Sequence, residues 1–133
     1  MNEKKARVII PINLDKSPED HEIEAAWIIA RHYNRAVDFL RPVDDYKRKT
    51  PDIVMNGQLW EIKSPIGKSK NTIERQIKRA VKQSRNIIVD GRRSAIPDNV
   101  LQSELLKQCM IRRSIKQLIF ITKKLSVVEI ISK

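Results

Sequence analysis

Hydrophobic and polar positions along this chain predict short helices and strands that alternate. Apolar residues recur at helical spacing over about 17–34, 71–84 and 97–113, so three helices are expected there. Ser17, Pro18 and Asn71 are the residues expected to begin the first two helices. Apolar and β-branched runs predict a hairpin at 52–63 and strands at 6–12, 36–40, 86–89, 117–122 and 125–131.

These segments predict an α/β fold in the order β-α-β-β-β-α-β-α-β-β, with a mixed sheet flanked by helices. Polar loops are expected at 41–50 and 64–69. The sequence contains no internal repeats, low-complexity segments or linkers. Residues 1–133 are therefore expected to form a single domain with its own core.

The most specific structural prediction concerns the hairpin. Asn56-Gly57 is a strong signal for a two-residue type I′ turn, because both central residues of that turn need a positive φ angle. A two-residue loop places Asp52 opposite Glu61, and the alternation of side chains along a strand puts Lys63 on the same face. The other face is apolar and is expected to pack on the core; it carries Ile53, Met55, Trp60 and Ile62.

The predicted placement of two carboxylates opposite each other, at positions 52 and 61, requires an explanation, because like charges that face each other across two strands are destabilising. A divalent cation between Asp52 and Glu61 would supply that reason, and Lys63 beside them indicates a catalytic site. A plainer interpretation stays open. In it, Asp52 only begins a strand, Glu61 is solvated and Lys63 is its ion-pair partner.

The first predicted helix adds another carboxylate. Glu22 lies in the middle of the apolar face that Ala26, Ile29 and Tyr33 define. A carboxylate directed at the core must be paired or bound to a metal, so a metal ligand and a buried salt bridge are both open for Glu22. His21 and His32 lie toward the edge of this helix and indicate little by themselves.

Charge changes the picture of what this chain contacts. The net charge is +11, and residues 63–93 carry 10 basic and 2 acidic side chains. A basic surface beside a metal site favours a polyanionic substrate, most commonly nucleic acid. The alternative is a basic helix that is only solvated.

Other classes of protein are disfavoured. The basic stretch lacks the aromatic or leucine face of a membrane-surface helix, no apolar run approaches the roughly 20 residues of a membrane span, and no signal peptide is expected. Cys109 is the only cysteine, which excludes an internal disulfide and a Cys-cluster zinc site. It is expected to be a buried small hydrophobe.

The pattern PD-x(n)-E-x-K, carried by Pro51, Asp52, Glu61 and Lys63 on the predicted hairpin, resembles the PD-(D/E)xK nuclease superfamily. That resemblance implies a restriction-endonuclease-like fold, and Glu22 matches the first-helix acid of many members.

More narrowly, several segments together resemble the C-terminal nuclease toxin domains of contact-dependent growth inhibition proteins, some of which cleave tRNA. These segments are Glu22 to Ala26, the strand at Val37, Pro51-Asp52, Glu61 to Ser64, and Gln83 before Ile87 to Val89. The large delivery region of those proteins is not part of this sequence. An excised toxin domain or a freestanding relative is therefore expected.

Residues and resemblance together indicate the same site. Asp52 and Glu61, helped by the Ile62 carbonyl, are expected to bind Mg²⁺, with Mn²⁺ and Zn²⁺ as alternatives and Glu22 as an outer ligand. Lys63 would stabilise charge on the phosphate. Residues expected to contact substrate are Gln76, Arg79 and Gln83, and those expected to contact backbone phosphates are Lys68, Lys70, Arg75, Lys82, Arg92 and Arg93.

The sequence thus predicts a metal-dependent endonuclease with a toxin-like role, and the resemblance favours tRNA as substrate. A DNase of the same fold, a metal-independent RNase and a non-catalytic basic module that binds nucleic acid are the alternatives. The resemblance also implies an immunity protein as partner if the chain is a toxin. Action in the cytoplasm is expected, with the delivery route left open.

Overall fold

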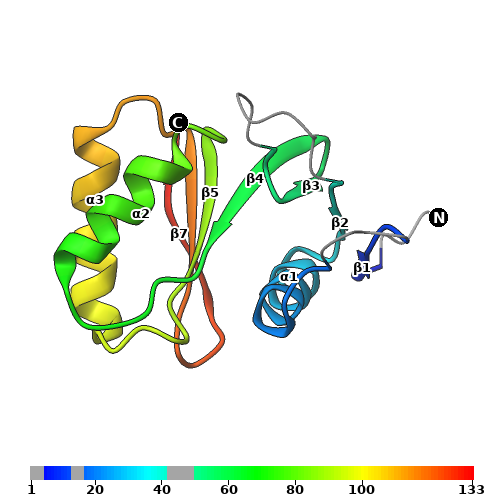
Figure 1. The fold of residues 1–133 in the computed structure, drawn as a ribbon, viewed down its shortest axis with the longest axis horizontal. Helices are drawn as coiled ribbons and strands as arrows, with labels where there is room; N and C mark the ends of the chain where they lie inside the picture. The colour runs from blue at the N-terminus through cyan, green and yellow to red at the C-terminus, as the bar shows by residue number, and fades with distance from the viewer. Residues whose placement is uncertain (1–4, 13–16, 42–49) are drawn as a thin grey trace.

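The computed structural model describes residues 5–12, 17–41 and 50–133, and these ranges form three helices and seven strands (Figure 1). In chain order the elements are β1 (Arg7–Ile9), α1 (Asp20–Tyr33), β2 (Ala36–Phe39), β3 (Ile53–Met55), β4 (Gln58–Lys63), α2 (Lys70–Ala80), β5 (Asn86–Asp90), α3 (Asp98–Ile111), β6 (Gln117–Ile121) and β7 (Val127–Ser132). Most of the predicted loop at 41–50 lies outside the described residues.

The strands form one mixed sheet in the order β1 to β7. Strands β1 and β2 are parallel, β2, β3 and β4 are successively antiparallel, β4, β5 and β6 are parallel, and β7 is antiparallel to β6. Each parallel pair is connected through a helix, as a parallel crossover requires. The prediction of a mixed α/β sheet with flanking helices is confirmed.

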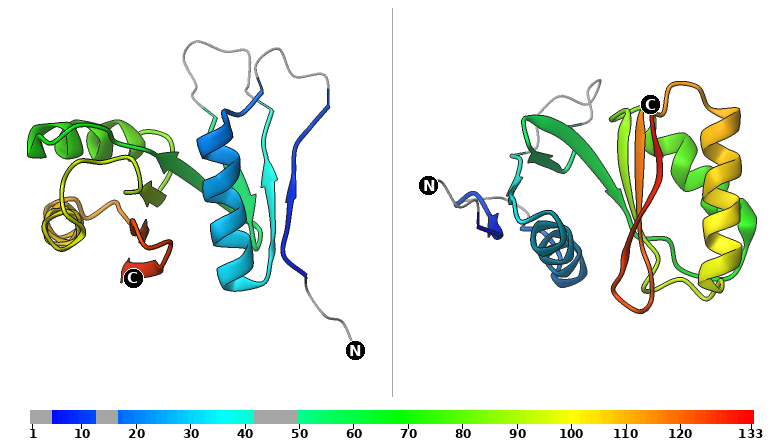
Figure 2. Two further views of the ribbon diagram at one scale, coloured as in Figure 1. Left: turned by 90° about the horizontal axis from the view of Figure 1, so that it is seen from below. Right: turned by 180° about the vertical axis from the view of Figure 1, so that it is seen from behind.

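Two hydrophobic clusters cover opposite faces of this sheet, which gives a helix–sheet–helix arrangement (Figure 2). The first cluster joins α1 to one face through residues such as Ile29, Trp60 and Ile88. The second joins α2 and α3 to the other face through Ile77 and Phe120, among others. Because adjacent residues of β5 belong to different clusters, the central strands are buried on both faces.

Helix starts are where the sequence predictions were wrong. Helix α1 begins after Glu19, not after Ser17, because Glu19 and Glu22 form a reciprocal capping box. Helix α2 begins after Ser69, whose Oγ accepts a hydrogen bond from the Asn71 N–H at 3.2 Å, so Asn71 lies inside the helix. Helix α2 also ends at residue 80, before the predicted end at 84.

Two single-residue features complete the description. Cys109 is a free cysteine, 1% exposed, as predicted, and its burial raises the pKa of the thiol to about 11. Across the described residues, no helix is both long and apolar enough to span a membrane.

Candidate active site

The β3–β4 hairpin has the predicted register. Ile53 pairs with Trp60, Val54 with Leu59 and Met55 with Gln58, which leaves a two-residue loop. The φ angles of Asn56 and Gly57 are 52° and 72°, so both lie in the left-handed region that a type I′ turn requires. The predicted core face is also confirmed, because Ile53, Met55, Trp60 and Ile62 are all buried in the α1-side cluster.

Asp52 lies immediately before β3 and remains tied to β4. Its N–H donates to the Trp60 carbonyl at 3.0 Å, and its Oδ2 accepts the Ile62 N–H at 2.8 Å. This second bond turns the carboxylate toward the strand that carries Glu61. The hairpin therefore brings the two predicted carboxylates together.

Glu61 is the most constrained acid of this group. Its side chain is on the sheet face away from the buried Trp60, yet the residue is only 3% exposed. The pKa of Glu61 is raised to about 8, first by burial and then by the neighbouring Asp52 carboxylate, while the Lys63 ammonium acts in the opposite direction. With this pKa the Glu61 carboxyl group is largely protonated at neutral pH, and an additional positive charge beside it would favour the ionised form.

Only part of that positive charge comes from the protein. Lys63 Nζ lies 3.1 Å from Glu61 Oε2, and both side chains are largely shielded from water. Glu61 Oε1 is buried and has no hydrogen-bond partner in the described part of the chain. Buried carboxylate oxygens are nearly always paired, so an unpaired one beside a second carboxylate fits the oxygen ligands of a hard divalent cation.

Glu22 has a different role from the hairpin carboxylates. Its Oε1 accepts the Glu19 N–H at 3.1 Å, as part of the capping box of α1. Within the described ranges, no hydrogen bond or ion pair links Glu22 to Asp52 or Glu61. The part of the chain that the structure describes also contains no salt bridge to Glu22, whose carboxylate serves the helix cap instead.

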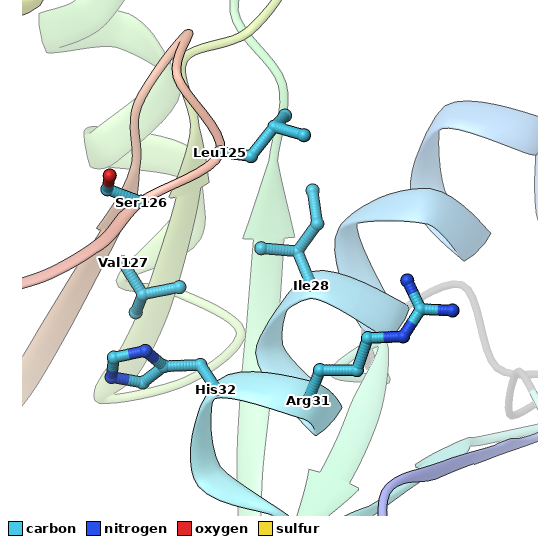
Figure 3. Close-up of a pocket in the computed structure, with 6 residues that line it drawn as sticks. All are labelled: Ile28, Arg31, His32, Leu125, Ser126 and Val127. Carbon is cyan, nitrogen blue, oxygen red and sulfur yellow. The ribbon is translucent and has the colours of Figure 1, made fainter.

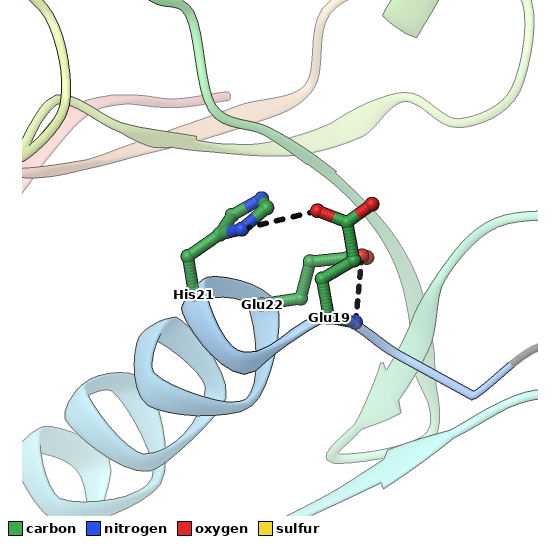
Figure 4. Close-up of side chains that lie close together, drawn as sticks. All are labelled: Glu19, His21 and Glu22. Carbon is green, nitrogen blue, oxygen red and sulfur yellow. Dashed lines mark hydrogen bonds and ion pairs between the residues drawn. The ribbon is translucent and has the colours of Figure 1, made fainter.

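The first turn of α1 instead gathers three ligand-type side chains (Figure 4). One ligand atom each from Glu19, His21 and Glu22 lies within 4.8 Å of the others, and His21 Nδ1 is 3.3 Å from Glu19 Oε2. The sequence pattern placed His21 at the helix edge but gave no reason to group it with Glu19. Their grouping depends on where the helix begins.

The basic residues predicted to contact phosphate lie mostly on exposed surface. Exposed side chains include Lys68, Lys70, Arg75, Arg79, Lys82 and Arg93. The loop before α2 and the loop after β5 are joined by a bridge between Gly67 and Ser94, and Ala95 N–H donates to the Gly67 carbonyl at 2.9 Å. Lys68, Lys70 and Arg93 therefore lie near the carboxyl ends of β4 and β5, the strand ends where Lys63 also lies.

The two glutamines predicted to reach substrate are less accessible. Gln76 and Gln83 are both half-buried. Gln83 Oε1 is buried and unpaired within the described residues. Within the described residues, neither glutamine forms a hydrogen bond with Asp52 or Glu61.

Arg92 differs from the other predicted phosphate contacts. Its side chain is 15% exposed, and its guanidinium binds Asp90, Glu24 and the His21 carbonyl at distances of 2.8–2.9 Å. A phosphate would have to displace these partners. We therefore correct the sequence prediction for Arg92: it links β5 to α1 and does not belong to the exposed basic surface.

Sequence reasoning missed Asp90 as a functional candidate and treated it as part of a closing turn. Asp90 is fully buried, at the carboxyl end of the parallel strand β5. A charged residue that ends an otherwise apolar parallel strand was the available signal, since such edges commonly carry functional groups.

Two pockets lie on the α1 side of the sheet. The larger, about 550 Å³, lies between α1 and the β6–β7 turn and is lined by Ile28, Arg31, His32, Leu125, Ser126 and Val127 (Figure 3). A neighbouring pocket of about 370 Å³ includes Trp27 and Arg92. Neither pocket is lined by Asp52, Glu61 or Lys63, so they are not the cleft of the predicted site.

Comparison with known proteins identifies the class. Residues 49–127 match the family model described as "Contact-dependent growth inhibition CdiA C-terminal domain", and this chain belongs to that family. The protein is therefore a toxin of the contact-dependent growth inhibition type, and the resemblance inferred from the sequence is confirmed at this level. The match includes Asp52, Glu61 and Lys63 but not Glu22.

A solved structure shares the fold. A chain of the "CdiA-CT/CdiI toxin and immunity complex from Burkholderia pseudomallei" superposes with a TM-score of 0.63 at 20% sequence identity. The match covers 97% of this chain and 96% of that chain. A search of curated protein sequences found no match.

Proposed function

We propose that this toxin is a metal-dependent nuclease that hydrolyses phosphodiester bonds, with tRNA as the favoured substrate. The observation that carries this proposal is Glu61. It is a buried carboxylate with one unpaired oxygen, next to Asp52 and 3.1 Å from the Lys63 ammonium. A divalent cation would pair with the free Glu61 oxygen and with Asp52, and a substrate phosphate would pair with the Lys63 ammonium.

In this proposal Asp52 and Glu61, with the Ile62 carbonyl, hold one Mg²⁺; Mn²⁺ and Zn²⁺ are the alternatives. A divalent cation held there would supply Lewis-acid chemistry for a phosphodiester and for a water molecule. The hairpin fixes the spacing of the two carboxylates, because the Ile62 N–H holds Asp52 and the strand holds Glu61.

Lys63 has a separate task. In the structure its ammonium is paired with Glu61 Oε2. With a cation bound to the carboxylates, the Lys63 ammonium would be available to stabilise the extra negative charge that develops on the phosphate in the transition state. Glu22 would orient a water or serve as an outer ligand, which requires its carboxylate to leave the helix cap.

Fold and motif support the same superfamily. Strand, helix and hairpin follow each other in the order implied by the PD-(D/E)xK resemblance, and the Asp, Glu and Lys of that motif share one hairpin. We therefore propose a single nuclease domain of the restriction-endonuclease-like type.

The substrate side rests on charge and resemblance. The exposed lysines and arginines of α2 and its flanking loops fit a polyanion. Preference for tRNA over duplex DNA comes from the resemblance to toxin domains that cleave tRNA. A small domain can also grip structured RNA by its backbone, without reading base sequence in a groove.

The deciding experiment is cleavage of total tRNA and of plasmid DNA with Mg²⁺ and with EDTA. Glu61→Ala and Lys63→Ala are expected to lower cleavage by two or more orders of magnitude, roughly the loss typical for a metal ligand or a charge-stabilising group. Neither side chain belongs to a hydrophobic cluster, so folding should persist and is checked by thermal unfolding.

Matched controls come from α3. Glu104→Ala and Lys107→Ala remove the same charges away from the hairpin and are expected to keep full activity. Activity in EDTA, or wild-type rates in Glu61→Ala, would contradict the metal site. Degraded chromosomal DNA with intact tRNA in a sensitive bacterium would instead show a DNase that uses the same site.

The remaining proposals concern partners and place of action. The solved relative is a toxin and immunity complex, so we propose that an immunity protein binds this chain. Nucleic acid as substrate implies action in the cytoplasm of the target cell. Expression should therefore arrest growth, and co-expression with the proposed immunity protein should restore it.

A further inference from the structure

Arg92 connects two segments that are distant in the sequence. Its Nε and Nη2 bind the two oxygens of Asp90 at 2.9 and 2.8 Å, so the pair is bidentate. Nη1 reaches Glu24 Oε2 at 2.9 Å, and Nη2 also donates to the His21 carbonyl at 2.9 Å. One guanidinium thus ties the loop after β5 to the first two turns of α1.

Asp90 extends this network to β4. It is fully buried, and its Oδ2 accepts the Ser64 hydroxyl at 3.4 Å. Ser64 directly follows Lys63, which pairs with Val89 in the parallel β4–β5 register. Asp90 therefore directly follows Val89, the residue whose pairing with Lys63 sets the register of β4 and β5 at this point.

We propose that Arg92, held by Asp90, is a positioning residue that fixes the first turn of α1 against the strand ends that carry Lys63. This inference rests on the proposed function, because it assigns Arg92 the task of aligning Glu22 on α1 with the Asp52, Glu61 and Lys63 group. Glu22 is the residue after His21, whose carbonyl Arg92 holds. The orientation of that turn therefore sets where the Glu22 carboxylate can reach.

The geometry needs arginine. Its planar guanidinium offers five donors in a fixed fork, which can serve a carboxylate bidentately while also reaching a second carboxylate and a carbonyl. A lysine at position 92 would keep the charge beside Asp90 but could not hold Glu24 and the His21 carbonyl at the same time. The variant Arg92→Lys therefore keeps the positive charge and removes only the contacts that position α1.

The first test measures the position of α1 without any activity. Amide hydrogen exchange of Glu22 and Ile23, whose N–H groups donate to the Glu19 carbonyl, is expected to become about tenfold faster in Arg92→Lys. Glu24→Gln, which weakens only the exposed arm of the network, is expected to give a smaller increase. Arg35→Lys alters an arginine beyond the opposite end of α1, bonded to Asn56 and the Asn34 carbonyl, and should leave these amides unchanged.

The second test measures catalysis at a temperature where all variants are folded. Arg92→Lys is expected to lower the maximal cleavage rate about tenfold, while tRNA affinity measured in EDTA stays unchanged. Unaltered hydrogen exchange in the first turn of α1 would overturn the positioning role. A cleavage rate of Arg92→Lys that falls only in proportion to the fraction of folded protein would overturn it as well. If the wild-type protein cleaves neither RNA nor DNA, the nuclease proposal fails, and the exchange measurement still decides whether Arg92 holds α1.

Discussion

At the scale of single residues, the two carboxylates of the hairpin could be predicted from the sequence, whereas the Arg92 network could not. Asp52 and Glu61 could be paired in advance because the turn between them fixes the register. Arg92 and Glu24 are 68 positions apart, and their contact depends on how α1 packs on the sheet. Patterns within a short stretch of sequence do not reveal such a contact, so Arg92 was predicted to contact backbone phosphate together with the basic residues around it.

A pH dependence of stability follows from Glu61. In the unfolded chain this carboxyl has its ordinary pKa of 4.5, and in the metal-free folded protein burial and Asp52 raise that pKa to about 8. Between these values the folded state binds the extra proton, so the free energy of unfolding of the metal-free protein should fall as pH rises from about 5 to about 8.

Denaturant unfolding at several pH values in EDTA measures this slope. Glu61→Gln keeps the shape but cannot ionise, and it should flatten the slope across this range. Glu74→Gln changes an exposed carboxylate of α2 and should leave the slope as in the wild type. Added Mg²⁺ is expected to restore stability near pH 8 in the wild type only. A wild-type slope that survives in Glu61→Gln would show that another group titrates.

At the scale of elements, the hydrophobic and turn patterns were sufficient to place the helices and strands of the described residues, but not the exact residues at which the helices begin and end. Helix starts depend on a competition between neighbouring caps, and Ser17 lost to Glu19 because the Glu19–Glu22 pair satisfies two backbone groups at once. Ser69 similarly preceded Asn71. The hairpin had no such competition, since Asn-Gly is the one dipeptide there that accepts two positive φ angles.

The turn gives a stability prediction. Gly57→Ala should destabilise the protein by about 1 kcal/mol, because Gly57 has φ +72° and an alanine there adopts a left-handed conformation that L-residues disfavour. Steric clash does not contribute, since a Cβ at this position meets no atom within 4 Å. Gly57→Asn should lose less, because asparagine tolerates this region. Equal losses in the two variants, compared by urea unfolding, would contradict a conformational cause.

At the scale of the whole molecule, the sequence predicted the mixed sheet because alternating strand and helix segments require crossovers. It could not predict which basic residues remain free, since that depends on which ones the fold turns inward. Arg92 and Lys123 are both engaged: Lys123 Nζ contacts the Gly91 and Ile96 carbonyls and Asp98. The exposed cations of α2 and its flanking loops remain available for the proposed polyanionic substrate.

Those exposed charges predict how nucleic-acid binding responds to salt. The triple variant Arg75→Gln, Arg79→Gln and Lys82→Gln removes three exposed cations of α2 and the turn after it. If each neutralises one phosphate, the slope of log affinity against log salt should become shallower by about 2–3 units, with weaker binding at low salt. The measurement is tRNA binding in EDTA across a salt series.

A second triple variant provides the matched control, because Lys107→Gln, Arg113→Gln and Lys116→Gln remove the same charge from α3 and the loop after it. Binding driven by net charge alone would weaken equally in both triple variants, whereas a localised surface predicts a loss confined to the first. Equal losses would therefore refute the assignment of the substrate to α2. They would leave the proposed metal site untouched, because Asp52 and Glu61 are held by the hairpin and not by the charge of the surface around it.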